Sequence, residues 1–161
     1  MVKRIPLTKG RVALVDDEDY EFLMQWKWYC NNDRAVRSMS VYKNGKRKQI
    51  KIQMSRIINK TPKGLETDHS DRNTLNNQKY NLRNATEIQN QMNAEKPNRP
   101  STSKYKGVTH IKGEKRCRTR ISINKKRISV GWYDSELEAA IAYNVAALEH
   151  HGEFARLNDV A

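Results

Sequence analysis

The chain has 161 residues, 37% of them hydrophobic, and its mean hydropathy of -0.94 is low for a protein with one well-filled core. A formal net charge of +13 and a pI near 9.9 favour a polyanionic partner, nucleic acid first, because solubility alone requires far less charge. No apolar run approaches the length of a transmembrane helix, and the opening segment MVKRIPLTKG lacks the apolar stretch of a signal peptide. We therefore expect a cytoplasmic protein of one or two small domains with no membrane partner.

The two cysteines, Cys30 and Cys117, are too few for a four-ligand zinc site and show no Cys-x-x-Cys spacing. They predict free thiols in a reducing compartment and no structural zinc.

Residues 1–60 are expected to form a β-rich region with one helix. The segment RVALV (Arg11–Val15) has the composition of a strand, and DDEDYEFLMQW (residues 16–26) predicts a helix whose first turn is acidic, as the helix dipole favours. The pair Asn44-Gly45 predicts a hairpin, because a type I′ turn needs a positive φ at both positions. The segment IQMSRIIN (residues 52–59) predicts a further short helix.

Residues 61–96 are rich in amides, with seven Asn among the twenty-seven residues from Thr67 to Asn93. One interpretation is a polar surface loop, since Asn and Asp hydrogen-bond their own backbone in turns. The other is a metal-dependent catalytic site. Asp68 and Asn90 offer hard oxygen ligands that suit magnesium or manganese rather than zinc, and a neutral His69 can take a proton from water.

A helix is predicted to begin near Glu87 and to carry Asn90. Thr86 and Gln89 have the spacing of a capping box, in which each side chain satisfies a backbone N–H group at the start of the helix. A ribbon carrying Asp68 and His69, followed by this helix, could close around one cation.

Residues 97–102 lie in the polar run PNRPSTS and are expected to be a linker. Beyond them, residues 103–160 predict three strands with turns near Lys112-Gly113 and Asn124-Lys125. A helix follows, DSELEAAIAYNVAALEHHG, with a capping box at Ser135 and a terminating glycine at Gly152. The whole chain is thus expected to be α+β.

The first part of this module is strongly basic. Ten Lys or Arg and one acid, Glu114, lie between Lys104 and Arg127. Side chains alternate along a strand, so Arg116, Arg118 and Arg120 are expected in one row, which Arg127 can join from the next strand. Such a row can contact the phosphates and guanine edges of DNA. We prefer this interpretation to that of a solvated surface without a partner. The opposite face is expected to pack on the Ala-rich helix through Ile121, Ile123, Ile128 and Val130.

The segments SKYKGV, RISVGWYD, EAAIAYNVAALEHHGE and FARLN resemble the AP2 DNA-binding domain over residues 103–158. The resemblance implies a three-stranded antiparallel sheet on one helix that reads the major groove of double-stranded DNA. It assigns DNA contacts to Lys106, Thr109, Arg118, Arg120, Ser122, Arg127 and Ser129. Cys117 stands where the family often has Trp, and Ser122 and Ser129 replace an Arg and a Trp of plant members, so the plant sequence preference is not transferred.

The segments DHSDRN, LNNQKYNLRNAT and QNQMN resemble the HNH endonucleases, or ββα-metal nucleases, in the phage and homing-type branch that has Asn at the last motif position. The flanking segments IPLTKGRVALVDDEDYEFLMQWKWY and PKGLETDH extend the resemblance over almost the whole chain. It implies that His69 is the general base and that Asn81 braces the ribbon and orients His69. It further implies that Asp68 and Asn90 bind Mg²⁺ or Mn²⁺. One-metal hydrolysis of this kind leaves 5′-phosphate and 3′-hydroxyl ends and nicks one strand at a time.

The sequence also allows alternative assignments. Asn84 and Asn93 are near enough in sequence to compete with Asn90 as ligand, and Ser55 stands where the family frequently has a His that could help bind phosphate. A DNA-binding regulator that retains an inactive nuclease fold is therefore the alternative function, and an RNA-binding protein is the third. No heptad or apolar stripe predicts a dimer, so we expect a monomer.

Overall fold

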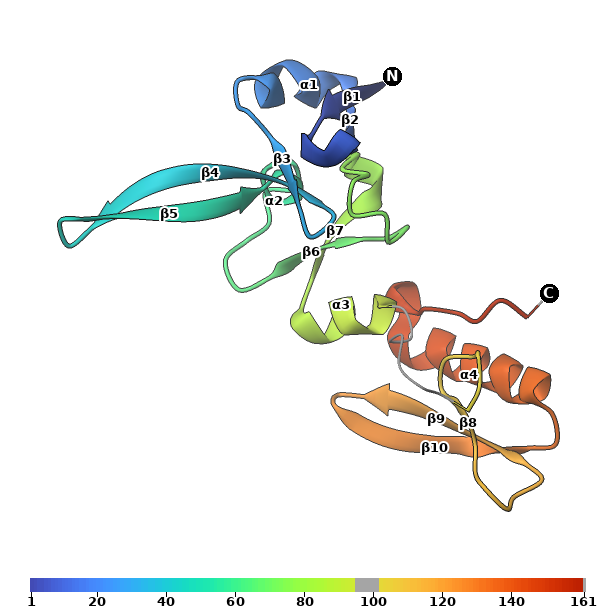
Figure 1. Cartoon of the computed structure of the whole chain (residues 1–161). Helices are drawn as coiled ribbons and strands as arrows, with labels where there is room; N and C mark the ends of the chain where they lie inside the picture. The colour runs from blue at the N-terminus through green and yellow to red at the C-terminus, as the bar shows by residue number, and fades with distance from the viewer. Residues whose placement is uncertain (95–101, 161) are drawn as a thin grey trace. The chain divides into compact units, whose positions relative to one another are not determined.

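The computed structural model describes residues 1–94 and 102–160, and it divides the chain into two compact units, Met1–Thr86 and Glu87–Ala161. Both units combine small antiparallel sheets with helices (Figure 1), as expected of an α+β chain. The division falls inside residues 61–96, the predicted nuclease motif. The predicted linker, residues 97–102, lies outside the described residues apart from Thr102.

The first unit begins with an antiparallel pair of strands, β1 (Val2–Pro6) and β2 (Val12–Asp16), joined by a short 3-10 helix, η1 (Thr8–Gly10). Helix α1 (Asp17–Met24) follows directly and carries three acidic residues in its first turn, so the predicted strand and helix are confirmed. The alternation of β2 buries Ala13 and Val15 completely, where they join Ile5 and Leu23 in the core.

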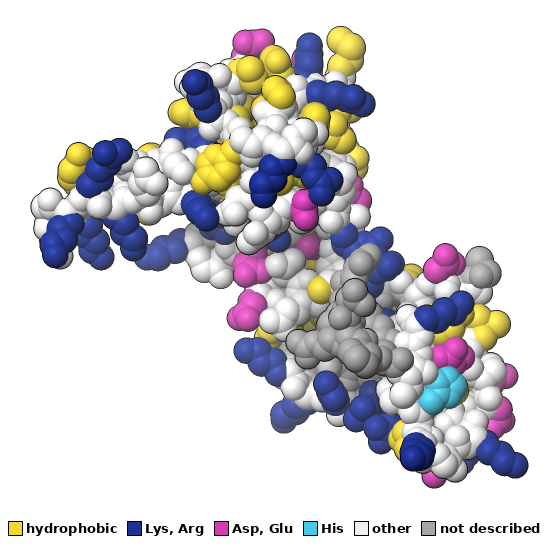
Figure 2. Space-filling view, viewed as in Figure 1, with side chains coloured by type: hydrophobic (Ala, Val, Ile, Leu, Met, Phe, Trp, Pro, Cys, Tyr) yellow, Lys and Arg dark blue, Asp and Glu magenta, His cyan; other side chains and the backbone are white. Residues whose placement is uncertain are grey.

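A three-stranded sheet continues the unit, in the order β3 (Tyr29–Asn31), β4 (Arg34–Lys43) and β5 (Lys46–Gln53), and short helix α2 (Met54–Ile58) follows. The predicted turn is confirmed, with φ of 51° at Asn44 and 72° at Gly45. The β4–β5 hairpin extends away from the rest of the unit (Figure 1), and Lys and Arg side chains stand along it (Figure 2).

Strands β6 (Glu66–His69) and β7 (Leu82–Ala85) form a two-stranded antiparallel ribbon, preceded at β7 by the 3-10 helix η2 (Lys79–Asn81). Helix α3 (Glu87–Asn93) comes next in the chain and begins at the residue predicted from the capping box. In chain order these elements are strand, strand and helix.

The second unit contains the predicted three-stranded sheet, in the order β10 (Lys126–Tyr133), β9 (Cys117–Ile123) and β8 (Val108–His110). Helix α4 (Glu136–His151) packs on this sheet and is followed by the 3-10 helix η3 (Gly152–Phe154). The Ser135 hydroxyl accepts a hydrogen bond from the Glu138 N–H at 3.1 Å, and Gly152 ends the helix with φ of 53°, so both helix boundaries are confirmed.

Small side chains on α4 allow it to lie close to the sheet. Ala139, Ala140 and Ala147 are fully buried, and the Thr119 hydroxyl donates to the Ala139 carbonyl at 3.2 Å. The prediction for Ile128 is wrong, since its side chain is 46% exposed. Strand β10 is an edge of the sheet, and the apolar cluster beneath α4 takes Val130 from it but not Ile128. Within residues 1–94 and 102–160, no helix is long and apolar enough to cross a membrane.

Gly107 is expected to be required for the second unit to pack. Its φ is +81°, and an added Cβ would lie 2.1 Å from Cδ2 of the buried Tyr143 and 2.7 Å from the Arg120 carbonyl oxygen. Gly107→Ala should therefore destabilise this unit by about 3 kcal/mol or more, from overpacking and backbone strain together. Urea unfolding with hydrogen–deuterium exchange of the β9 amides would measure the effect.

Gly113→Ala is the matched control, since Gly113 has a similar φ of +87° and open space where the Cβ would stand. It should cost only about 1 kcal/mol of backbone strain. Equal losses in the two variants would contradict the role assigned to the Tyr143 contact.

Candidate functional site

Asp68 and His69 are the last two residues of strand β6 in the β6–β7 ribbon, and both are buried in the first unit. Their relative exposures are 4% and 3%, although both are polar residue types that usually lie at the surface. The antiparallel register pairs Asp68 with Arg83 and His69 with Leu82. A buried carboxylate next to a buried imidazole is an arrangement typical of catalytic sites, because burial shifts the protonation of both groups.

The His69 ring is held by Asn77, whose Oδ1 lies 3.1 Å from Nε2. The Asn77 amide is oriented by its own nitrogen, which donates to the Leu75 carbonyl at 3.3 Å. Oδ1 can only accept, so the neutral ring carries its proton on Nε2 and its lone pair on Nδ1. The basic atom of His69 is therefore Nδ1.

Burial is the main cause that lowers the pKa of His69 below its usual value. The hydrogen bond that the ring donates to Asn77 opposes this shift, the positive charge of Arg34 adds to it, and the negative charges of Asp71 and Asp68 oppose it. The imidazole is consequently neutral, and able to accept a proton, at neutral pH.

Asp68 forms an ion pair with Arg83 across the ribbon. Oδ2 of Asp68 accepts from Nε of Arg83 at 2.8 Å and from Nη2 at 2.7 Å, and the Arg83 side chain is itself only 17% exposed. A guanidinium held in this way compensates the buried carboxylate and fixes its orientation.

Most of the amides in the loop between β6 and β7 serve the loop itself. The Asp71 carboxylate accepts from Nδ2 of Asn76 at 2.7 Å and from Nδ2 of Asn81 at 2.8 Å, and it closes a turn by accepting from the Asn73 N–H at 2.8 Å. Oδ1 of Asn81 accepts in return from the Asp71 N–H at 2.9 Å. The polar-loop interpretation thus accounts for these three asparagines, while Asn77 is the one whose amide bonds to His69.

Strand β2 holds this loop against the first unit. Leu14 donates its N–H to the Leu75 carbonyl and accepts from the Asn77 N–H, both at 2.8 Å. At the end of β2, the Asp16 carboxylate accepts from the Gln78 side chain at 3.0 Å and from the Lys79 N–H at 2.7 Å. The position of Asn77, and with it that of the imidazole, therefore depends on a strand more than sixty residues earlier in the chain.

The other predicted residues of this site lie as follows. Asn81 is 1% exposed and braces the loop, whereas the side chain that meets Nε2 of the His69 ring is that of Asn77, which the sequence analysis did not single out. Asn90 lies on α3, in the second compact unit, so its role as second ligand stays a prediction. Asn84 accepts from the Asn59 side chain at 2.9 Å, and Ser55 is buried in α2.

The donor chemistry fits a magnesium or manganese ion better than zinc. Asp68 supplies a buried carboxylate, and the predicted second ligand is an amide oxygen, so both are hard oxygen ligands. Both cysteines are free, buried thiols. Among residues 1–94 and 102–160, no three His, Cys, Asp or Glu side chains are grouped to hold a metal ion without an amide ligand.

The outward face of the second unit's sheet gathers most of the predicted DNA contacts. The register places Arg120 opposite Ser129, Ser122 opposite Arg127, and Thr109 opposite Arg118, and residues opposite one another share a face. Cys117, Thr119 and Ile121 alternate with these residues along β9 and are buried toward α4. The alternation derived from the sequence is thus confirmed for Arg118 and Arg120.

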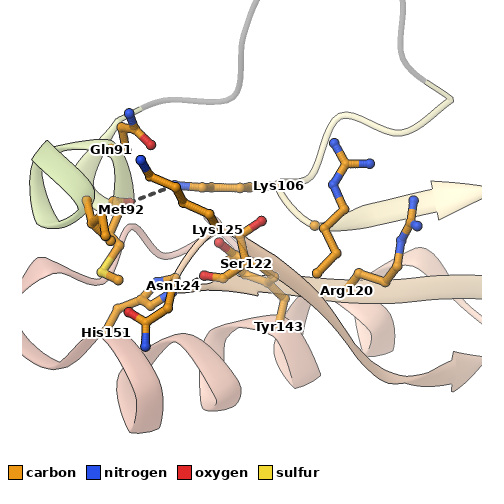
Figure 3. Close-up of a pocket in the computed structure, with 12 residues that line it drawn as sticks. Gln91, Met92, Lys106, Arg120, Ser122, Asn124, Lys125, Tyr143 and His151 are labelled. Atoms are coloured by element: carbon orange, nitrogen blue, oxygen red, sulfur yellow. Dashed lines mark hydrogen bonds between the residues drawn. The ribbon is translucent and has the colours of Figure 1, made fainter.

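Two of the predicted DNA-contacting residues do not lie in this row, and one further residue of the face was not predicted from the sequence. Arg116 lies one residue before β9 rather than in the row. Lys106 lies before β8, and its ammonium group donates to the carbonyls of Met92 and Ala94, both at 2.7 Å (Figure 3). Trp132 stands opposite Arg118, whose guanidinium lies 5.8 Å from the indole centroid, on the face that carries the arginines.

A pocket of about 440 Å³ opens between α3 and the β9–β10 end of the sheet (Figure 3). Among the described residues that line it, none is acidic and four are Lys or Arg: Lys106, Arg120, Lys125 and Arg127. Burial, with the like charges of Arg118 and Arg127, lowers the pKa of Arg120. Cations crowded in this way are stabilised by an anion, so the pocket suits a phosphate group.

The neutral state of His69 predicts a pH dependence of stability. The unfolded chain protonates this imidazole near pH 6.5, whereas the folded chain, with its lowered pKa, does not. The stability that His69 contributes is therefore present above about pH 6.5 and lost as pH falls toward the folded pKa. Wild type should lose more stability between pH 7.5 and 5.5 than His69→Gln does.

Urea unfolding in EDTA, in a Trp132→Phe background, would report on the first unit, because Trp26 and Trp28 then supply the fluorescence. His150→Gln, at an exposed position on α4, is the control and should keep the wild-type pH dependence. An identical loss in wild type and His69→Gln would contradict the burial argument.

Comparison with known proteins supports a nuclease family. A protein of Acanthamoeba polyphaga mimivirus, named as an uncharacterized HNH endonuclease, is 32% identical to this chain over 153 residues, which cover 94% of this chain and 77% of that relative. No family model matches the chain, and no solved structure matches it. The aligned residues include both the ribbon with Asp68 and His69 and the β8–β10 sheet. Similarity of this extent shows that the chain belongs to the HNH endonuclease family.

Proposed function

We propose that this protein is a metal-dependent DNA endonuclease that nicks duplex DNA and is positioned on it by an AP2-like module. The observation that carries the proposal is the buried Asp68-His69 pair, whose imidazole is kept neutral by burial and oriented by Asn77, in a chain of the HNH family. Membership of that family suggests DNA hydrolysis.

His69 acts as the general base. Its Nδ1 accepts a proton from the attacking water, and the imidazolium that forms is stabilised by the nearby carboxylates of Asp68 and Asp71. The water oxygen bonds to phosphorus as the bond from phosphorus to the 3′ oxygen breaks, and solvent supplies the proton for that oxygen. The products are 5′-phosphate and 3′-hydroxyl ends.

Asp68 and Asn90 would hold the divalent cation, Mg²⁺ or Mn²⁺, as the resemblance implies, and the cation would supply positive charge near the phosphate. Arg83 keeps the Asp68 carboxylate in a fixed orientation through Oδ2. Asn81 supports the site indirectly, because its amide closes the loop that presents Asn77 to His69.

The sheet of the second unit binds double-stranded DNA with its outward face, as its resemblance to AP2 domains implies. The support is the cationic and polar character of that face, which carries Arg118, Arg120, Arg127, Thr109, Ser122 and Ser129. The cation-lined pocket beside it accepts a backbone phosphate. Tethering this reader to the nuclease raises the local concentration of the catalytic site on DNA.

The alternative is a DNA-binding regulator without nuclease activity. One observation favours it, the buried Ser55 at the position where the resemblance places a phosphate-binding His. The regulator needs the basic sheet but has no use for a neutral, oriented His69.

Purified protein should convert supercoiled plasmid to open circles with Mg²⁺ or Mn²⁺ but not with EDTA. DNA ligase should reseal the nicks, because the ends are 5′-phosphate and 3′-hydroxyl. His69→Ala should slow nicking by about 100-fold or more, the usual contribution of a general base. Salt-sensitive binding to duplex without any metal-dependent cleavage would instead support the regulator.

In the same assay, Asn77→Ala distinguishes the asparagine that positions His69 from those that only stabilise the loop. It removes the hydrogen bond to Nε2 of His69 and should lower the rate, whereas Asn73→Ala changes the same loop without touching the imidazole. Equal rates for these two variants would show that Asn77 does not position the base.

Arg120→Gln should weaken duplex binding by about 1–3 kcal/mol, on the order of 10- to 100-fold, and lower the salt slope by about one unit, because the sheet face loses a phosphate or base contact. Fluorescence anisotropy with His69→Ala protein would measure it without cleavage. Lys27→Gln, an exposed position in the first unit, is the charge-matched control. Identical affinities for the two variants would show that the sheet face does not contact DNA.

A further inference from the structure

The β4–β5 hairpin, residues 34–53, has the composition of a nucleic-acid contact and is here called the basic hairpin. It contains seven Lys or Arg and no Asp or Glu. Its only buried residues are Ala35 and Val36, at the base. The rest of the ribbon extends from the body of the first unit (Figure 1), and exposed residues lie on both of its faces, so core packing does not explain it.

The register gives the two faces of the basic hairpin different chemistry. One face is polar and carries the pairs Ser38 with Lys51, Ser40 with Gln49, and Tyr42 with Arg47. The Arg47 guanidinium lies along this face, since Nε and Nη2 donate to the Ser40 hydroxyl at 3.1 and 2.9 Å. The other face carries Met39 with Ile50 nearer the base, and Val41 with Lys48 and Lys43 with Lys46 nearer the tip.

We propose that the basic hairpin lies in the major groove of duplex DNA, with its polar face toward the base edges and the lysines near its tip on the phosphates. This inference rests on the proposed function, since it takes duplex DNA as the substrate. The B-DNA major groove admits a two-stranded β-ribbon, and Ser, Gln, Arg and Lys are side chains that read base edges there. An A-form RNA duplex offers no such groove, because its major groove is deep and narrow.

The dimensions and charge of the basic hairpin agree with this placement. Strand β4 has ten residues, which at about 3.3 Å each span about 33 Å, close to the roughly 34 Å of one DNA turn. The lack of any acid matters as much as the cations, because a carboxylate in the groove would be repelled by phosphates on both sides. The surface is distinct from the AP2-like sheet and makes a second contact with the same duplex.

The first test is the salt dependence of duplex binding. In full-length His69→Ala protein, a triple variant (Lys43→Gln, Lys46→Gln and Lys48→Gln) is compared with a control triple (Lys9→Gln, Lys27→Gln and Lys63→Gln), all at exposed positions of the first unit. The hairpin triple should bind a 40-bp duplex about 10-fold or more weakly. Its salt slope should fall by about two to three units, since each phosphate contact contributes about 0.9. An affinity and slope equal to those of the control triple would overturn the proposal.

The second test is a footprint. Replacing Val41–Lys48 by Asn-Gly keeps Ser40 opposite Gln49 and a two-residue turn, so a shortened hairpin can still form. Loss of about 10 Å of ribbon should remove about three base pairs of protection. Methylation of guanine N7 in the base pairs that lose protection should weaken binding of the protein with the full-length hairpin but not of the shortened variant. An unchanged footprint, or no binding of duplex by the full chain, would overturn the proposal.

Both readouts are of binding, so they are independent of the nuclease proposal. A protein that binds through the basic hairpin but never nicks would retain this inference and lose the catalytic one. A protein that nicks while the hairpin variants match their control would lose only this inference. Circular dichroism and urea unfolding of each variant would show that the fold is preserved.

Discussion

The carboxylate of Asp71 organises the loop on which the candidate active site depends. Its two oxygens accept hydrogen bonds from the side chains of Asn76 and Asn81 and from one backbone N–H. These three hydrogen bonds hold the turn that follows His69. Strand β2 then holds the far end of the loop by pairing with Leu75 and Asn77. These bonds leave one amide, that of Asn77, directed at Nε2 of His69. This network thus sets the orientation of the base, whereas burial is the main cause that keeps it neutral.

The two compact units contain different parts of the proposed nuclease. The first unit contains the Asp68-His69 ribbon, with its compensating Arg83, and the basic hairpin. The second contains α3 and the sheet-on-helix module. Within that unit, Lys106 links the two elements, because its ammonium group binds the carbonyls at the C-terminal end of α3, where the helix dipole favours a cation. A residue assigned to DNA contact by resemblance therefore also has a structural partner.

Local signals predicted the secondary structure well, for physical reasons that act over a few residues. The turn at Asn44-Gly45, the cap at Ser135 and the alternation of Arg118 and Arg120 each depend on one residue's backbone preference or on the period of a strand. The same alternation was wrong for Ile128, because the period of β10 does not tell how much of an edge strand the helix covers. Trp132 was missed because the register of β10 shifts between Ser129 and Gly131, which alternation alone does not reveal.

The sequence by itself determined the charge, the motif residues Asp68 and His69, the arginine row and the order of the elements, since these follow from residue type and short spacing. Only the tertiary structure decided which of seven chemically identical asparagines meets the imidazole. That choice depends on the path of a loop held by Leu14 and Asp16, far away in sequence. The pairing of Asp68 with Arg83 likewise required the register of the ribbon. Hydrogen bonds depend on position to within a few tenths of an ångström, and packing over the whole unit fixes that position.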